Sequence, residues 1–143
     1  KYAFIAIVFG GGPVLFIVTQ LILQLDPWYT PRLIIPLAGM IFSSAMNGVS
    51  LASERMQAEI NRGIKYSDAK RIAFNASLIP IVNSLFAVGL VSLPGMMTGQ
   101  ILSGVSPLIS VRYQIMVMCM IFSSVGLSSF TFLVLARFDN VKT

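Results

Sequence analysis

The sequence predicts an all-α protein built as a polytopic bundle of transmembrane helices, and three observations support this prediction. Hydrophobic residues make up 56% of the chain and charged residues 10%, whereas a soluble domain carries about 25% charged residues. The mean hydropathy is +0.84. The apolar residues gather in long runs, and a helix that crosses a bilayer needs about 20 of them. We therefore expect about four spans, a cytoplasmic amphipathic helix and a short re-entrant or interfacial helix.

Composition also excludes several classes of function. The net charge of +5 is modest for so apolar a chain and does not indicate nucleic-acid binding. A single cysteine, Cys119, excludes an internal disulfide and a multi-cysteine metal site, and the chain has no histidine. We assign no metal ligands. Lys1 is followed at once by an apolar run without a signal-peptide cleavage site, so we expect residues 1–143 to be one transmembrane domain, the C-terminal part of a longer protein.

The first expected span is the uncharged run at 2–25. Its GGGP string at 10–13 predicts a kink or an unwound turn, because proline removes a helix hydrogen bond. A short loop follows, in which Trp28 and Tyr29 suit the membrane interface.

The second expected span runs over 33–52. Gly39, Ser43 and Asn47 recur every four residues along one of its faces. Such a row of small and polar residues predicts close approach of another helix.

The third expected span, at 72–93, contains Pro80 and ends before a Pro-Gly pair. The stretch at 96–107 is too short to cross a bilayer, and its glycines favour a short re-entrant or interfacial helix. The last expected span runs over 113–136, where Ser124 and Ser128 lie four residues apart.

The longest polar segment, at 53–71, holds five of the ten basic residues and three of the five acidic ones. If this segment and both ends of the chain face the cytoplasm, eight basic residues lie on that side and two on the other. This is the positive-inside distribution of a multi-pass membrane protein. One interpretation of the segment is therefore a loop that only sets the orientation of the spans.

The order within this polar segment favours a second interpretation. Met56 and Ile60 follow Ala52 at a spacing of four, which predicts an amphipathic helix. Gly63 suits the end of that helix, and Ser67 suits the N-cap of a following one. A loop that only sets the orientation of the spans would not need two helices separated by a glycine break.

No acidic or basic residue lies well inside an expected span. A carrier driven by protons or sodium normally keeps an ionisable residue at membrane depth, despite a cost of about 2.5 to 3.5 kcal/mol or more. If this chain moves a solute uphill, the energy is most simply supplied by a cytoplasmic partner that acts on the polar segment.

Several strings resemble one permease family: MNGVSLASERM at 46–56, SLIP at 77–80, VGLVSLPGMMTGQILSGVSPL at 88–108 and RYQIMVM at 112–118. This is the FetB-type iron export permease family (UPF0014 family), which also includes plant aluminium-tolerance permeases. The resemblance covers about residues 36–137. Family members are about twice as long as this chain, in agreement with the expectation of a longer protein.

The resemblance implies the permease subunit of an ATP-binding-cassette (ABC) transporter in the bacterial inner membrane. The chain itself is then no enzyme and binds no cofactor, since ATP and Mg²⁺ belong to a separate ATPase subunit; a GxxxxGK[ST] string is absent here. The expected partners are that ATPase, a second permease copy and the lipid bilayer. The polar segment resembles a coupling helix, whose implied ATPase contacts are Glu54, Arg55, Met56, Glu59, Ile60, Arg62 and Gly63.

We expect the transport path beside the break after the third span, because unwound backbone at membrane depth must be covered by protein or water. The substrate would be an exported metal ion, iron-like, or a small solute. Methionine sulfur would suit a soft metal, but methionine also serves as flexible packing. An ATP-independent secondary carrier or channel is the alternative function. The candidate path residues are Asn83, Ser84, Met96, Met97, Thr98 and Gln100.

Overall fold

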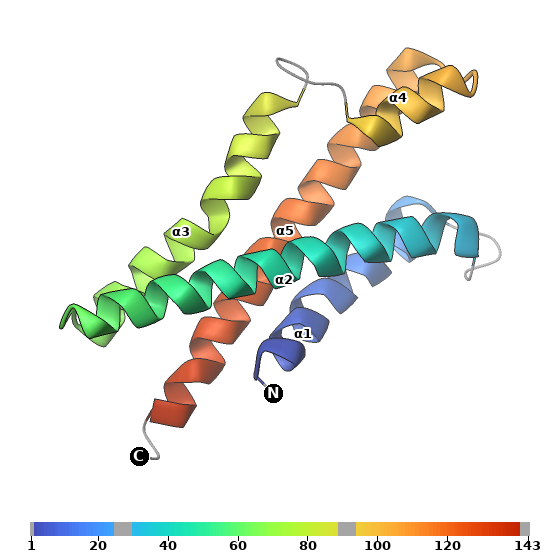
Figure 1. Cartoon of the computed structure of the whole chain (residues 1–143). Helices are drawn as coiled ribbons and strands as arrows, with labels where there is room; N and C mark the ends of the chain where they lie inside the picture. The colour runs from blue at the N-terminus through green and yellow to red at the C-terminus, as the bar shows by residue number, and fades with distance from the viewer. Residues whose placement is uncertain (1, 25–29, 89–93, 141–143) are drawn as a thin grey trace.

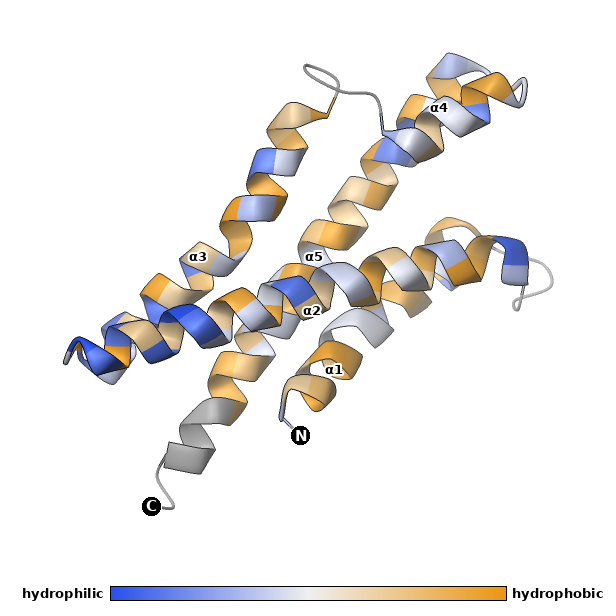
Figure 2. Ribbon diagram, in the orientation of Figure 1, coloured by the Kyte–Doolittle hydropathy of each residue, from blue (hydrophilic) through white to orange (hydrophobic). Residues whose placement is uncertain are grey.

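The computed structural model describes residues 2–24, 30–88 and 94–140, and every element in these ranges is a helix (Figure 1). The predicted all-α membrane bundle is confirmed. Figure 2 shows hydrophobic colour along most of α1 and α5 and hydrophilic colour at the turn between α2 and α3. Large apolar side chains such as Phe4 and Phe86 are about 70% exposed, as expected where lipid surrounds a protein.

Helix α1 spans Tyr2–Phe16 and continues as the π-helical segment η1, Ile17–Ile22. The backbone N–H of Leu23 donates to the carbonyl of Val18, five residues earlier, at 2.9 Å. The expected unwound turn at 10–13 is wrong, because α1 remains helical through Pro13. The change of helix type comes after the proline, as a local π segment.

Helix α2, Pro31–Asn61, is one continuous helix of 31 residues. Pro31 stands at its start, where a proline loses no helical hydrogen bond. The helix passes Ala52 without a break, so the predicted amphipathic helix is the last part of α2. At 1.5 Å per residue α2 is about 46 Å long, more than the roughly 30 Å hydrocarbon core of a bilayer.

The predicted glycine break between two helices is confirmed at Gly63. Its φ of +78° lies in the left-handed region, and its N–H donates to the Ile60 carbonyl at 2.9 Å. The next N–H, of Ile64, donates to the Glu59 carbonyl at 3.2 Å, which completes a Schellman motif. The predicted Ser67 cap is wrong, since the next helix already begins one residue earlier and has Lys65 at its N-cap.

Helix α3 spans Tyr66–Ala87, the short helix α4 spans Gly95–Leu102, and α5 spans Pro107–Asn140. Helix α4 confirms the expected short helix after the Pro-Gly pair. The last helix starts six residues before the predicted 113, because Pro107 suits a first helical turn.

Three helical stretches of the described residues are long and apolar enough to cross a membrane: Tyr2–Ile22, Pro31–Asn61 and Pro107–Leu135. The third expected span, at 72–93, corresponds to α3, which is not among them. Its residues 89–93 lie outside the described part of the chain.

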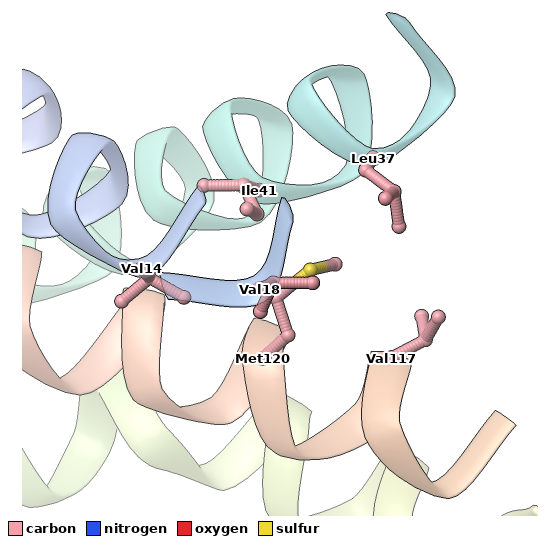
Figure 3. Packing of buried hydrophobic residues seen from close by; sticks show 6 residues of the cluster. All are labelled: Val14, Val18, Leu37, Ile41, Val117 and Met120. Carbon is pink, nitrogen blue, oxygen red and sulfur yellow. The ribbon is translucent and has the colours of Figure 1, made fainter. Parts of the chain in front are cut away.

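Helix α5 is the centre of the bundle and packs against α1, α2, α3 and α4. A buried apolar cluster joins α1 and η1, α2 and α5 (Figure 3). At the other end of α2, a second cluster joins α2, α3 and α5. The first cluster consists of Val14, Val18, Leu37, Ile41, Val117 and Met120, and the second of Ala52, Met56, Ala73 and Leu133.

Small residues set how closely these helices approach. A Cβ atom at Gly10 of α1 would lie 2.5 Å from the backbone nitrogen of Ser128 in α5. A Cβ atom at Gly48 of α2 would lie 2.7 Å from a Val125 methyl group. The hydroxyl of Ser124 also donates to the Ile41 carbonyl of α2, at 3.4 Å.

The predicted row of small residues on α2 does not contact another helix of this chain. Gly39, Ser43 and Asn47 are exposed, and nothing lies within 4 Å of a Cβ atom built at Gly39. The neighbouring face of α2 packs instead. Its buried residues include Ile41, Ala45, Gly48 and Ala52.

The start of α1, the α2–α3 turn and the described end of α5 lie in the lower half of Figure 1. The end of α3, together with α4, lies in the upper half of the picture. The polar segment, the start of α1 and the described end of α5 therefore share one end of the bundle.

Candidate functional site

The polar segment forms a structured helix end rather than a loose loop. Glu59 is 2% exposed, and its Oε1 atom accepts from both neighbouring arginines. Arg55 Nη2 lies 2.8 Å from it and Arg62 Nη1 lies 3.2 Å from it. The helical spacing explains this arrangement, because residues three and four apart lie on one side of a helix.

The predicted coupling residues divide between two faces of α2. Met56 is buried in the second apolar cluster and Glu59 is buried beneath its arginines. The other residues reach the surface, including the apolar Ile60, which is 37% exposed. The exposed set is Glu54, Arg55, Ile60, Arg62 and Gly63.

A cation–π contact joins α3 to α5 at the same end of the bundle. Lys70 Nζ lies 5.6 Å from the centre of the Phe130 ring, which also meets Phe74 edge to face. Both contacts connect the start of α3 with α5, so the helix after the Gly63 turn is held against the centre of the bundle.

A cavity of about 160 Å³ lies between α2 and α3, with one α5 side chain also in its wall. Uncharged polar residues from both helices face it. Of the six predicted path residues, Ser84 alone lines it. The lining residues are Ser44, Asn47, Gly48, Leu51, Ser77, Pro80, Ile81, Ser84 and Val125.

A second cavity, of about 470 Å³, lies among α3, α4 and α5 and is mainly apolar. Of the predicted path residues it contains Met97, together with the sulfur-bearing Met118 and Cys119. Met96, Thr98 and Gln100 are half-buried on α4 and line neither cavity, while Asn83 is exposed on α3. The six residues are therefore not brought together.

Sequence reasoning missed Ser44, Asn47 and Ser77 as neighbours across one cavity. The available signal was the recurrence of uncharged polar residues in two apolar runs, one of which also contains Pro80. Which of them face each other depends on how α3 packs on α2. Among the described residues, no group of three or more histidine, cysteine, aspartate or glutamate side chains could hold a metal ion.

Comparison with known proteins gives consistent matches. Residues 1–66 and 65–139 match the model of the uncharacterised protein family UPF0014. The chain is 42% identical to the UPF0014 membrane protein slr1647 of Synechocystis, over 76% of this chain and 48% of that protein. It is 38% identical to the probable iron export permease protein FetB of Escherichia coli, over 89% of this chain and 54% of that protein.

A plant relative also matches: the protein ALUMINUM SENSITIVE 3 of Arabidopsis thaliana is 35% identical, over 72% of this chain and 43% of that protein. The chain thus spans about half the length of these curated relatives. No solved structure matches it.

Proposed function

Because this chain belongs to the uncharacterised membrane protein family UPF0014, we propose that it is part of the permease subunit of an ABC transporter that exports a metal ion. One relative is named a probable iron export permease and another is named for aluminium sensitivity. Since the chain spans about half the length of these relatives, it forms in this proposal the C-terminal part of a longer permease.

The observation that carries the proposal is the surface at the end of α2. Ile60 is exposed there between charged residues, and the buried Glu59 holds Arg55 and Arg62 in place. An apolar side chain in a rim of fixed charges is typical of a protein interface. In this proposal the surface docks onto the ATPase subunit, which binds ATP and Mg²⁺.

The distribution of charge in α2 and α5 supports an external source of energy. Within the membrane-length helices, charged side chains lie near the helix ends, as Arg32 and Arg112 do. A secondary carrier would normally keep such a group at membrane depth. We accordingly assign the α2–α3 turn and both ends of the chain to the cytoplasm, in a bacterial inner membrane, with a second permease copy completing the transporter.

The Ile60→Asp substitution tests the docking surface. In the full-length permease co-expressed with its ATPase, it should lower recovery of the ATPase by about tenfold or more, because a charge replaces a central apolar contact. Asn61→Asp is the matched control, since Asn61 is also exposed and gains the same charge without losing an apolar group. Recovery is measured by quantitative immunoblot of the purified complex.

Transport assays then test the activity. Reconstituted complexes should hydrolyse ATP faster when iron, copper or aluminium ions are supplied, and an organic solute serves as the comparison. Full transport by the permease without any ATPase would contradict the proposal and support an ATP-independent carrier or channel.

A further inference from the structure

We propose that the cavity between α2 and α3 binds the transported metal as a hydrated ion, which it recognises through the ion's own water molecules. This inference rests on the proposed function above. It adds the place where the substrate sits and the chemical form in which it is held.

The first support is that two serine hydroxyls in the cavity wall already donate their hydrogen atoms to backbone carbonyls of α3. Ser77 Oγ donates to the Phe74 carbonyl at 2.7 Å, and Ser84 Oγ donates to the Pro80 carbonyl at 2.9 Å. A hydroxyl has one hydrogen and two lone pairs. These two side chains therefore offer acceptors, and no donors, to a molecule in the cavity.

Pro80 leaves one backbone acceptor of α3 without its usual donor beside this wall, although that residue, Ala76, is not among those that line the cavity. Pro80 has no N–H, so the Ala76 carbonyl, four residues earlier in α3, lacks its normal helical donor. Helix carbonyls point toward the C-terminus, and the Ala76 carbonyl therefore points toward the proline that lines the cavity. On the opposite wall, Ser44 and Asn47 of α2 bring two more side-chain oxygens, together with hydroxyl and amide hydrogens that can donate.

The balance of acceptors without charge determines what fits. No charged side chain is among the residues that line this cavity. A small hard cation gives up its inner water shell reluctantly and usually does so for carboxylates. A wall of neutral oxygens does not replace that shell well, but it can accept hydrogen bonds from the bound waters, which are strong donors. The volume of about 160 Å³ is well above the roughly 10 to 15 Å³ that a single water molecule needs.

The second cavity offers different chemistry and provides a direct contrast. Its walls carry the sulfur atoms of Met97, Met118 and Cys119 and one polar side chain, Gln114, among apolar residues. Sulfur ligands select soft ions such as Cu(I), whereas oxygen suits harder ones. A substrate held by direct coordination to soft ligands would bind there and not between α2 and α3.

Hexaamminecobalt(III) tests the form of the bound ion, because its ammonia ligands do not exchange and it can interact only through N–H donors. The experiment uses the full-length permease in detergent, without ATPase or nucleotide, and follows Mn²⁺ binding by electron paramagnetic resonance. The complex ion should displace bound Mn²⁺. If Mn²⁺ binds at the cavity and hexaamminecobalt(III) does not displace it, the ion is coordinated directly and the inference is wrong.

Substitutions of opposite effect test the location. Asn47→Leu and the Ser77→Ala/Ser84→Ala pair should each weaken Mn²⁺ binding by about tenfold, the effect of losing one or two hydrogen bonds. Asn47→Asp should tighten it, because a carboxylate attracts the cation. Ser43→Ala is the matched control, since Ser43 is exposed beside Ser44 and does not line the cavity. Equal affinities in all four variants would overturn the assignment, as would Mn²⁺ binding abolished by Met97→Leu alone.

Because Mn²⁺ binding is measured without ATP, a negative result for the metal site can be distinguished from a negative result for the proposed function. Mn²⁺ bound as predicted, in a permease that never recruits an ATPase, would refute the transporter proposal and leave the site intact. ATPase-driven metal export with no response to the cavity variants would refute the site alone.

Discussion

Among single residues, Glu59 has the most unusual environment at the end of α2. Its carboxylate is 2% exposed, while the arginines that contact it are 46% and 64% exposed. Removing one member of such a cluster has unequal effects. An arginine left alone is solvated by water, but a buried carboxylate left alone is not.

We therefore expect the Arg55→Met/Arg62→Met double substitution to lower the free energy of unfolding by about 2 to 4 kcal/mol. Glu59→Gln should lower it by about 1 kcal/mol or less, since the exposed arginines contribute little by themselves. Each single arginine substitution should cost less than half of the double, because one arginine still satisfies the shared oxygen. Thermal unfolding of the full-length permease in detergent measures all four, and a larger loss for Glu59→Gln would contradict this account.

The sequence predicted part of this arrangement. The spacing of Ala52, Met56 and Ile60 identified the amphipathic helix, and Gly63 identified its end. The burial of Glu59 was not predicted, because a charged side chain is normally exposed. The sequence did contain one indication of this burial: Glu59 lies three residues after Met56, which puts both residues on one side of the helix.

Among the helices, the contact of α1 with α5 depends on the absence of a side chain at Gly10. We expect Gly10→Ala to lower the free energy of unfolding by about 1 to 3 kcal/mol, the usual cost of overpacking, because the new methyl group would meet the Ser128 backbone. Gly12→Ala, two residues away in the same helix, adds a methyl group with nothing within 4 Å. It should leave the thermal unfolding temperature of the full-length permease unchanged or raised. Equal losses for both would attribute the effect to helix propensity rather than to packing.

The packing of α2 on α5 shows why the sequence could not predict which face of a helix is buried. Helix α2 carries two rows of small residues on neighbouring faces, one with Gly39 and Ser43 and the other with Ala45 and Gly48. Both satisfy the same sequence criterion for close packing. The second row packs because Val125 and Ser129 of α5 fit around Gly48, and those partners lie about eighty residues away in the sequence.

For the whole molecule, the order of the helices followed from the sequence. The cavity between α2 and α3 did not, because its walls come from separate apolar runs whose relative rotation is set by packing. The predicted path residues were chosen by their closeness in sequence to the Pro-Gly break. The structure separates them, since Ser84 lines the cavity between α2 and α3 whereas Met97 lines the cavity among α3, α4 and α5.

Cysteine labelling tests the orientation that we propose. In the full-length permease with Cys119→Ser, a cysteine at Ser103, just after α4, should react with a membrane-impermeant maleimide added to intact spheroplasts. A cysteine at Lys65, in the α2–α3 turn, should react only after lysis, because the basic residues hold that turn on the cytoplasmic side. Mass spectrometry of the labelled protein reads the result. Labelling of the Lys65 position in intact spheroplasts would reverse the orientation.

The unbroken length of α2 also gives it a mechanical property. It approaches α5 closely at Gly48, with thirteen residues on the side toward Asn61 and seventeen on the side toward Pro31. A stiff helix held there is a lever with its fulcrum inside the bundle and arms of about 20 and 26 Å. A push of about 3 Å on the Asn61 arm would swing the Pro31 arm about 4 Å the opposite way. A movement at one end of α2 would thus be transmitted along the whole helix.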